Sequence, residues 1–405
     1  MSVLADVRTL IAGLRSKYSA RERRPIWMLI SDFYPGIGGA ERQAQSLSKA
    51  MMARGWSVRV VTRRHGYPHS KGLSSDDSAE GIPIVRVFSR GGRKIASFFY
   101  ILGGLWHLLL HGRRGIYHAH DIGSPAWLAL SARYLLGGRC IIKLRAGRDH
   151  YKKRFSSGVA RWYFNRLLRL ADRIIVVNSE LERYLGELAI PAGRIVRVPN
   201  AADTEIFYPV SIKRKLKTRR CLGLPIDQTI VLYVGRIEAI KGVDILLHSW
   251  SLLPAKLRSE SLLLLVGDGT QRKASVQLAD SLGIQGSVLF AGKQQVVRDY
   301  YWAADLFVLP SRSEGLSNAL VEAMSCGLLA VASDVGGAPD LVEDGYNGAL
   351  FESENGNHLS QLLASLMAKP TRWEEMGLRG HQVASRHANL SNIADRVQSL
   401  YRQLD

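Results

Sequence analysis

Two cations stand close together in a loop bounded by glycines, Gly235-Arg-Ile-Glu-Ala-Ile-Lys-Gly242. Arg236 can grip phosphate oxygens through two parallel hydrogen bonds, and Lys241 adds a compact positive charge. The loop follows an apolar run typical of a strand, and a helix is expected to begin near Val243 with its positive dipole end toward the loop. This pattern predicts a diphosphate site that stabilises a departing phosphate. An ordinary capped surface loop is the plainer alternative.

Two carboxylates lie eight residues apart, at Glu314 and Glu322. Glu314 is expected in the loop after a strand at 306–309. A helix is predicted to begin near Asn318, which puts Glu322 just over one turn into it, on the buried side. A buried carboxylate needs hydrogen-bond donors, and the two hydroxyls of a ribose are a natural pair. Amides at 317–319 could also reach phosphate. For each glutamate alone, a surface or capping carboxylate is the alternative.

These loops belong to a regular alternation of short apolar runs and helical patterns, typical of an open parallel sheet covered by helices on both faces. Strands are expected at 25–31, 58–62, 84–88, 116–120, 140–144, 173–177 and 195–198, and then at 229–234, 261–266, 288–291, 306–309 and 330–333. Helices are expected at 40–53, 125–136, 159–170, 180–185, 243–253, 271–282 and 318–325. Ligands of such sheets bind beyond the carboxyl ends of the strands.

The alternation predicts an α/β protein of two doubly wound, Rossmann-like domains. We expect a basic extension over 1–24, an N-terminal domain over 25–207, a C-terminal domain over 208–385, and a final helix over 386–405 that could cross back to the N-terminal domain. The linker is placed within 200–221, where Pro209 and a basic run replace the apolar pattern. If the two carboxyl edges face each other across a cleft, that cleft holds two substrates at once.

The net charge of +20 is confined to the first half of the chain. Residues 1–200 hold 34 Lys and Arg against 13 Asp and Glu, whereas residues 201–405 hold 21 against 22. A strongly basic surface attracts anionic membranes, nucleic acid or acidic substrates. A solvated basic face is the alternative.

The most apolar segment, 95–110, has 16 residues and is shorter than the roughly 20 that a membrane span needs. Basic residues flank it at Arg93, Lys94, Arg113 and Arg114. It is either a buried helix or an interfacial helix with basic flanks.

The cysteines and the N-terminal residues indicate the cellular compartment of the protein. Cys140, Cys221 and Cys326 form no CxxC pair, so we expect neither a disulfide framework nor a zinc site. The N-terminus shows no apolar run followed by a cleavage site, so we expect no secretory signal. Together these observations predict a cytoplasmic protein.

The motifs together resemble glycosyltransferase family 4, whose members are retaining enzymes with the GT-B fold. In the C-terminal half the resemblance is carried by Gly235-Arg236…Lys241-Gly242 with Asp244, by Gly267-Asp268-Gly269, by Glu314 and Glu322 at the E-x7-E spacing, and by the segments Gly327, Ala332–Gly337 and Asp344–Gly348. In the N-terminal half it is carried by Tyr34-Pro35…Gly38-Gly39-Ala40-Glu41, His118-Ala119-His120-Asp121 and Val198-Pro199-Asn200-Ala201-Ala202-Asp203. The match covers nearly the whole chain from about residue 26.

The resemblance implies a role for each matched residue. The catalytic set is Glu314, His120, Arg236 and Lys241, with Glu314 near the reacting carbon and His120 lining the sugar and acceptor side. The donor set is Gly38, Gly39, Gly235, Arg236, Lys241, Gly267, Glu314, Gly315, Leu316, Ser317, Asn318 and Glu322. The co-substrate it implies is a nucleoside diphosphate sugar.

Two departures from the family pattern bear on the acceptor and the hinge. The turn at 145–150, Arg-Ala-Gly-Arg-Asp-His, is more basic than is usual in the family, which places Arg145 and Arg148 on the acceptor side and indicates an anionic acceptor. Asn-Ala-Ala-Asp at 200–203 replaces Asn-Gly-Val-Asp near the hinge. There is no Asp-x-Asp motif, so we expect no essential metal and no other cofactor, with Arg236 and Lys241 neutralising charge instead.

The resemblance implies a hexosyl transfer with retention, for which we favour front-side attack over a glycosyl-enzyme intermediate. The basic half and segment 95–110 favour a lipid-linked or surface-polysaccharide glycan as acceptor, met at the inner face of a membrane. Three alternatives stay open: a nucleotide-sugar epimerase on the same fold, a degenerate transferase that only binds, and a basic nucleic-acid-binding protein. Against the last, the charge is not interleaved with aromatic residues in a recognisable motif.

Overall fold

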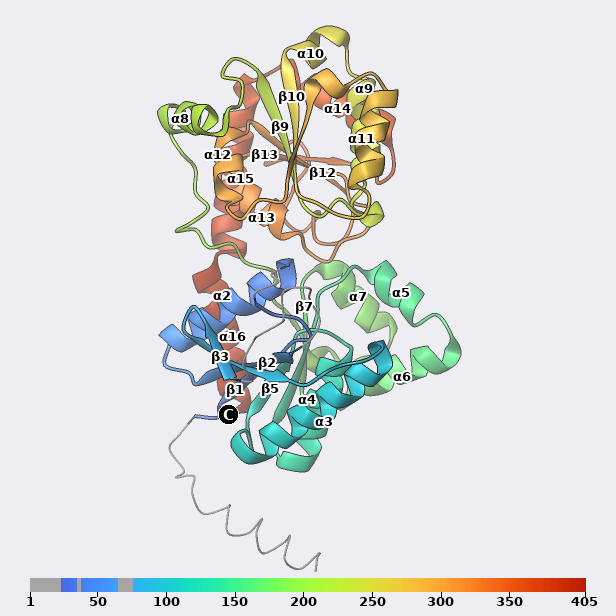
Figure 1. The fold of residues 1–405 in the computed structure, drawn as a ribbon, viewed down its shortest axis with the longest axis vertical. Coiled ribbons are helices and arrows are strands. Elements are labelled where there is room, and N and C mark those ends of the chain that lie inside the picture. Colours follow the sequence, from blue (N-terminus) through green and yellow to red (C-terminus); the bar gives the residue numbers. More distant parts are fainter. Residues whose placement is uncertain (1–22, 35–37, 65–75) are drawn as a thin grey trace, which may run out of the picture.

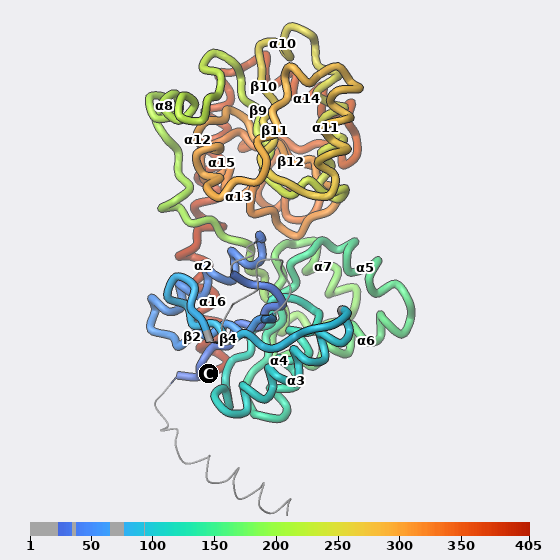
Figure 2. Tube along the Cα trace, viewed as in Figure 1, coloured from blue at the N-terminus to red at the C-terminus, as the bar shows by residue number. Residues whose placement is uncertain are grey.

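The structure is a computed structural model that describes residues 23–34, 38–64 and 76–405. Most of the expected extension over 1–24, and residues 35–37 of the turn after the first strand, lie outside the described residues. Two α/β units lie end to end, the N-terminal half below and most of the C-terminal half above (Figure 1). The Cα trace shows the chain passing from one unit to the other and returning at its C-terminal end (Figure 2).

The N-terminal unit has an eight-stranded sheet in the order β3-β4-β2-β1-β5-β6-β7-β8. Its strands are β1 (Ile26–Leu29), β2 (Val58–Arg63), β3 (Asp76–Ala79), β4 (Ile82–Val87), β5 (Ile116–Ala119), β6 (Arg139–Leu144), β7 (Arg173–Val176) and β8 (Ile195–Arg197). All neighbours run parallel except β3 and β4. The sequence pattern does not predict β3, because its residues, Asp-Asp-Ser-Ala, form an edge strand with no apolar run.

The helices of this unit are α2 (Gly39–Ala53), α3 (Arg93–His111), α4 (Ser124–Leu136), α5 (Arg148–Arg154), α6 (Gly158–Leu170), α7 (Ser179–Glu187) and the short η2 (Ala192–Arg194). The apolar segment 95–110 forms most of α3. Gly104 lets α3 pack closely on α4, because a Cβ there would lie 2.5 Å from a methyl carbon of Leu128.

The C-terminal unit has a six-stranded, wholly parallel sheet in the order β11-β10-β9-β12-β13-β14. Its strands are β9 (Thr229–Val234), β10 (Ser261–Val266), β11 (Val288–Gly292), β12 (Leu306–Leu309), β13 (Leu329–Ser333) and β14 (Ala349–Phe351). Its helices are α8 (Ile212–Leu222), η3 (Ala239–Lys241), α9 (Val243–Ser251), α10 (Ala255–Ser259), α11 (Arg272–Ser281), η4 (Gln285–Ser287), α12 (Arg298–Ala303), α13 (Asn318–Ser325), α14 (Gly356–Met367) and α15 (Thr371–His387).

The linker is shorter than the expected 200–221, because the basic run forms helix α8 of the C-terminal unit. Arg219 anchors this helix: its Nη2 donates to Asp305 Oδ2 at 2.6 Å and its Nε donates to the Ala303 carbonyl at 2.8 Å. A polar run carries no apolar periodicity, yet it can pack as a helix through one buried arginine.

The last helix, α16 (Leu390–Leu404), belongs to the N-terminal unit and packs on α2. Its apolar face, including Ile393, Val397 and Tyr401, is buried in the same core cluster as β1 and α2. The two passages between the units touch each other at their crossing. The Ala202 amide donates to the Ala388 carbonyl at 2.9 Å, and the Leu390 amide donates to the Ala202 carbonyl at 3.1 Å.

Candidate active site

The loop cation and the first glutamate meet at the carboxyl end of the C-terminal sheet. Lys241, the last residue of η3, forms an ion pair with Glu314 through its Nζ. Ser311 Oγ donates a second hydrogen bond to the same carboxylate oxygen at 2.8 Å. Both charged side chains are largely shielded, with 19% of Lys241 and 11% of Glu314 exposed. The pair therefore places one positive and one negative group at fixed positions in a poorly solvated corner.

Arg312 holds the two loops of this pair together. Its guanidinium donates two hydrogen bonds to Asp244, at 2.9 and 2.6 Å, and a third to Glu354 at 2.8 Å. Asp244 lies in the first turn of α9, three residues after Lys241, and the bonded guanidinium lowers the pKa of that carboxyl. This bidentate contact fixes the spacing between the lysine loop and the glutamate loop.

Arg236 is exposed in the loop after β9, and its own carbonyl accepts a hydrogen bond from Tyr233 Oη at 2.8 Å. Burial raises the pKa of Tyr233, the Glu314 charge raises it further, and the Arg236 charge opposes the shift. The tyrosine ring thus lies within electrostatic reach of both predicted groups, although Arg236 points to solvent. Gly267, at φ +145°, packs against the carbonyl of Gly235 at a distance that leaves no room for a side chain.

Glu322 is buried in α13, with 8% of its surface exposed. Tyr301 Oη, on α12, donates to its carboxylate at 2.9 Å. Burial raises the pKa of Glu322 to about 7, and Arg42, on α2 of the N-terminal unit, opposes that rise. A carboxylate that half-ionises near neutral pH and lies under the electrostatic influence of the opposite unit is suited to accept hydroxyl hydrogen bonds from a ligand between them.

The start of α13 meets the first turn of α2. Ser317 caps α13 by accepting from the Leu320 amide, and Asn318 Nδ2 donates to the Gly39 carbonyl at 2.8 Å. Gly38 is the residue before α2, so the N-termini of two helices from opposite units converge here. Their first amides have no intrahelical acceptor, which makes the junction suited to an anion.

The donor loop, residues 314–317, is fastened to the N-terminal unit by two asparagines. Asn178 Nδ2 donates to the Gly315 carbonyl at 2.5 Å, and Asn200 Nδ2 donates to the Leu316 carbonyl at 2.8 Å. A Cβ at Gly315 would collide with the carbonyl of Arg145, so only glycine permits this approach. The units therefore meet at the expected carboxyl edges.

His120 lies at the end of β5 but is buried, with 2% of its surface exposed. Its ring stacks on His118 with centroids 4.4 Å apart, and its Nε2 lies 3.3 Å from Met28 Sδ. Burial, together with neighbouring cations, keeps the pKa of His120 well below its usual range, so the ring is neutral. Its contact with a sugar stays a prediction.

Arg145 and Arg148 lie at the carboxyl edge of β6, where carboxylates balance both charges. Arg145 Nη2 lies 3.3 Å from Asp121 Oδ2, and Arg148 Nε lies 3.4 Å from a carboxylate oxygen of Glu180. The basic turn that indicated an anionic acceptor is therefore less positive than its sequence suggests. Asp121, which the sequence argument left without a role, is the balancing group.

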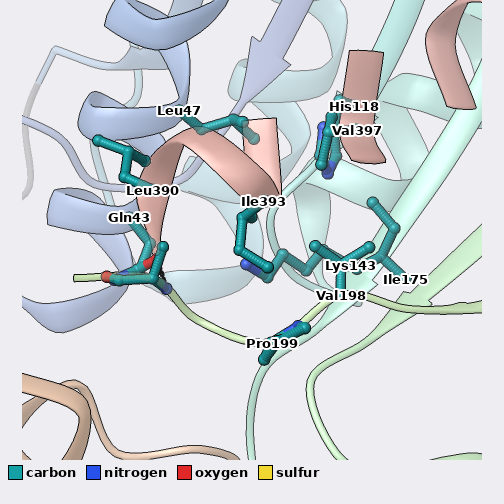
Figure 3. A pocket seen from close by; sticks show the side chains of 11 residues that line it. Gln43, Leu47, His118, Lys143, Ile175, Val198, Pro199, Leu390, Ile393 and Val397 are labelled. Carbon is teal, nitrogen blue, oxygen red and sulfur yellow. Dashed lines mark hydrogen bonds between the residues drawn. The ribbon is translucent and has the colours of Figure 1, made fainter. Parts of the chain in front are cut away.

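A cavity lies between α2, α16 and the N-terminal sheet, and its lining includes Gln43, His118 and Lys143 (Figure 3). Lys143 Nζ donates to Asn200 Oδ1 at 3.3 Å, which links it to the donor loop through the Asn200 amide. Burial, with Arg145 nearby, lowers the pKa of Lys143 to about 8. The His118 ring accepts or donates one hydrogen bond with Tyr401 at 2.7 Å, and its buried Nε2 has no partner among the described residues.

Sequence reasoning missed Arg42, Tyr301, Asn178 and Arg312. Arg42 directly follows a quoted motif, so helical spacing from Gly38 could have indicated it. Tyr301 and Asn178 reach the site from separate elements and leave no signal in linear spacing. Among the described residues no three His, Cys, Asp or Glu side chains are grouped as a metal site would require.

Two family models match the chain. The model described as Glycosyltransferase Family 4 matches residues 37–206, and the model described as Glycosyl transferases group 1 matches residues 215–383. Among curated proteins, the D-inositol 3-phosphate glycosyltransferase of Mycolicibacterium smegmatis is 39% identical over 194 residues, which are 46% of this chain and 43% of that protein. The chain spans about half the length of the curated relatives it matches.

Solved structures share the architecture over most of the chain. Sucrose-phosphate synthase from Thermosynechococcus elongatus superposes with a TM-score of 0.82 at 24% identity, covering 94% of this chain and 99% of that one. HepE of Anabaena, in complex with UDP and glucose, superposes with a TM-score of 0.79 at 20% identity, covering 94% and 100%. The two Rossmann-like units form the GT-B fold.

Proposed function

Since the chain belongs to glycosyltransferase family 4, we propose that it is a retaining, metal-independent hexosyltransferase that uses a nucleoside diphosphate sugar. The observation that carries the proposal is the Lys241–Glu314 pair beside the start of α13, with Glu322 one turn further along. These groups supply a cation for phosphate, free amides, and a carboxylate for ribose at one junction. A UDP-sugar is the first donor to test, because HepE was solved with UDP and glucose.

In the proposed reaction the diphosphate leaves toward positive charge. Lys241 and the first amides of α13 stabilise the departing oxygens, and the exposed Arg236 folds over the diphosphate when the donor is bound. Glu314 already accepts hydrogen bonds from Lys241 and Ser311, which suits a group that positions the sugar rather than one that attacks it. The acceptor hydroxyl attacks the same face that the phosphate leaves, and the departing phosphate oxygen takes its proton.

The proposed acceptor is a lipid-linked or surface-polysaccharide glycan, met in the cytoplasm at the inner face of a membrane. The N-terminal half presents a positive and a negative group to this acceptor, since Arg145 and Asp121 lie at the same carboxyl edge of the sheet. A paired guanidinium and carboxylate offer both donors and acceptors to the hydroxyls of a sugar. The basic charge of this half attracts the acceptor's membrane.

The donor assignment is tested by a thermal-shift screen against UDP-, GDP- and ADP-sugars, because a ligand that binds only the folded state raises the apparent stability. Glu322→Ala is expected to lose the shift, while the exposed Glu260→Ala keeps it. Turnover of the best donor is then measured with and without EDTA and is expected not to change. Donor binding and turnover at wild-type levels in both Lys241→Ala and Glu322→Ala would refute the assignment.

A further inference from the structure

Helix α3 carries an exposed apolar stripe along its outer side. Its inner side is already buried, through Tyr100 and Leu108 among others. The stripe recurs every three or four residues and consists of Ile95, Phe98, Leu102, Trp106 and Leu110, each between 54% and 64% exposed. Helical spacing of this kind places all five side chains on one line, about 22 Å long from Ile95 to Leu110. The helix is thus apolar on the solvent side as well as the core side.

The stripe continues onto the neighbouring helices. Helix α4 packs against α3 and exposes Trp127, Tyr134 and Leu135. Helix α6 exposes Trp162 and Val159, at 67% and 79%, and it joins α4 through Trp127 and Tyr163, whose rings lie 5.4 Å apart. These residues and the α3 stripe define the α3–α4–α6 face. The three helices lie together on one side of the N-terminal unit, at the lower right of the view (Figure 1).

The face is set in a strongly basic part of the chain. Residues 81–171 contain seventeen Lys and Arg but only two acidic residues, Asp121 and Asp149. Lys94 precedes the stripe, Arg114 follows it, and Arg161 and Arg166 lie on α6, all four exposed. Tryptophan, tyrosine and phenylalanine among cations are typical of surfaces that enter the headgroup region of a bilayer.

We propose that the α3–α4–α6 face docks on a bilayer that contains anionic lipid. A second copy of the chain fits less well, because two such basic halves repel each other. Within the described residues no helix is both long and apolar enough to cross a membrane, so α3 lies in the plane of the interface. Apolar insertion and charge attraction then act together.

The geometry connects this face with the proposed reaction. Arg63 Nη2, at the end of β2, donates to Ser97 on α3 at 3.1 Å and to Ser124, the first residue of α4, at 2.7 Å. The beginning of the stripe therefore lies at the carboxyl edge of the sheet, the edge that meets the donor loop. A docked protein holds this edge close to the membrane surface, where a lipid-linked acceptor has its sugar. This step rests on the proposed function, whereas docking itself does not.

Docking is tested by flotation of the full chain with vesicles of phosphatidylcholine, alone or mixed with phosphatidylglycerol. We expect binding to the mixed vesicles at low salt and little to phosphatidylcholine alone. Leu110→Ser is expected to weaken binding about tenfold, and Lys94→Gln about fivefold. The matched control is Leu252→Ser in the C-terminal unit, since both leucines are 57% exposed. It is expected to float like the wild type.

Three results would overturn the proposal: no flotation with phosphatidylglycerol, an equal loss in Leu110→Ser and Leu252→Ser, or self-association in sedimentation that Leu110→Ser abolishes. Nucleotide-sugar binding by thermal shift separates the two proposals. A variant that no longer docks but still binds donor shows that docking depends on the α3–α4–α6 face and not on the donor site. Docking with no binding or transfer of any nucleotide sugar would count against the proposed function and leave the face standing.

Discussion

Replacing Glu322 by glutamine is expected to remove the pH dependence of donor binding. The side chain is buried, accepts a hydrogen bond from Tyr301, and has its pKa raised to about 7 by burial. The ionised form accepts hydrogen bonds from both hydroxyls of a ribose through its two oxygens, whereas the protonated form uses one oxygen as a donor and binds the pair less well. The donor is therefore expected to bind the ionised form of Glu322, and protonation of this carboxyl at low pH weakens donor binding.

The expected size follows from that pKa. Near pH 6 roughly one tenth of the Glu322 side chains are ionised, and near pH 8 roughly nine tenths, so the affinity for donor rises about tenfold between them. The contribution of Glu322 to folding stability changes with pH in the opposite direction. The folded pKa lies above the unfolded value of 4.5, so the folded state holds a proton that the unfolded state releases. The contribution of Glu322 to the free energy of unfolding thus falls by about 3 kcal/mol as pH rises from 4.5 to about 7.

The assay is titration calorimetry with UDP-glucose, whose diphosphate bridge has no proton to lose in this pH range. The wild type and the exposed control Glu260→Gln should show the tenfold rise, while Glu322→Gln should bind weakly with a flat profile. In chemical denaturation without ligand, the difference in the free energy of unfolding between the wild type and Glu322→Gln should change by about 3 kcal/mol between pH 4.5 and pH 7, whereas the difference between the wild type and Glu260→Gln should stay constant. A flat wild-type binding profile, or the full rise in Glu322→Gln, would refute the reasoning.

Three further predictions concern the cation, the buried lysine and the contact between units. Lys241→Ala is expected to lower turnover by about a hundredfold or more, because the ion pair with Glu314 and the phosphate contact both go, whereas the exposed Lys273→Ala keeps wild-type rates in the same assay. Lys143→Met is expected to be more stable than wild type near pH 7. Because the folded pKa of Lys143, about 8, lies below the unfolded value of 10.5, the wild type gains stability as pH rises between these values. The difference in the free energy of unfolding between the two proteins should therefore shrink by about 3 kcal/mol, as measured by denaturation at pH 8 and at pH 10.5. Asn200→Ala removes the amide donated to Leu316 and is expected to raise the KM for donor severalfold with a smaller change in kcat, and an unchanged KM would remove the positioning role.

Much of the fold can be predicted from the sequence because parallel strands buried on both faces are short apolar runs. The parallel strands of the N-terminal sheet and five of the C-terminal strands could be anticipated in this way. Elements that do not consist of an apolar run could not be predicted in this way. β3 is a polar edge strand, β14 has only three residues, and α8 packs through the charged Arg219.

The candidate site divides in the same way. Lys241, Glu314 and Glu322 can be singled out because they lie in loops or first turns that glycines and strand ends mark in the sequence. Tyr301 and Arg42 could not, because they reach Glu322 from helices that only the three-dimensional packing brings near it. Nor does the sequence tell that Lys143 is buried, since lysine is ordinarily a surface residue.

The bridge between Ala202 and Asn389 governs how the enzyme can open. The two chain segments that join the units are tied together at this one spot, so the units swing most easily about an axis through it once their other contacts part. A swing that widens the gap between the units would part Asn318 from Gly39 and the donor loop from Asn178 and Asn200, while the segments at the pivot stay in place. Shortening either segment would stiffen the swing and slow release without touching a group that contacts sugar.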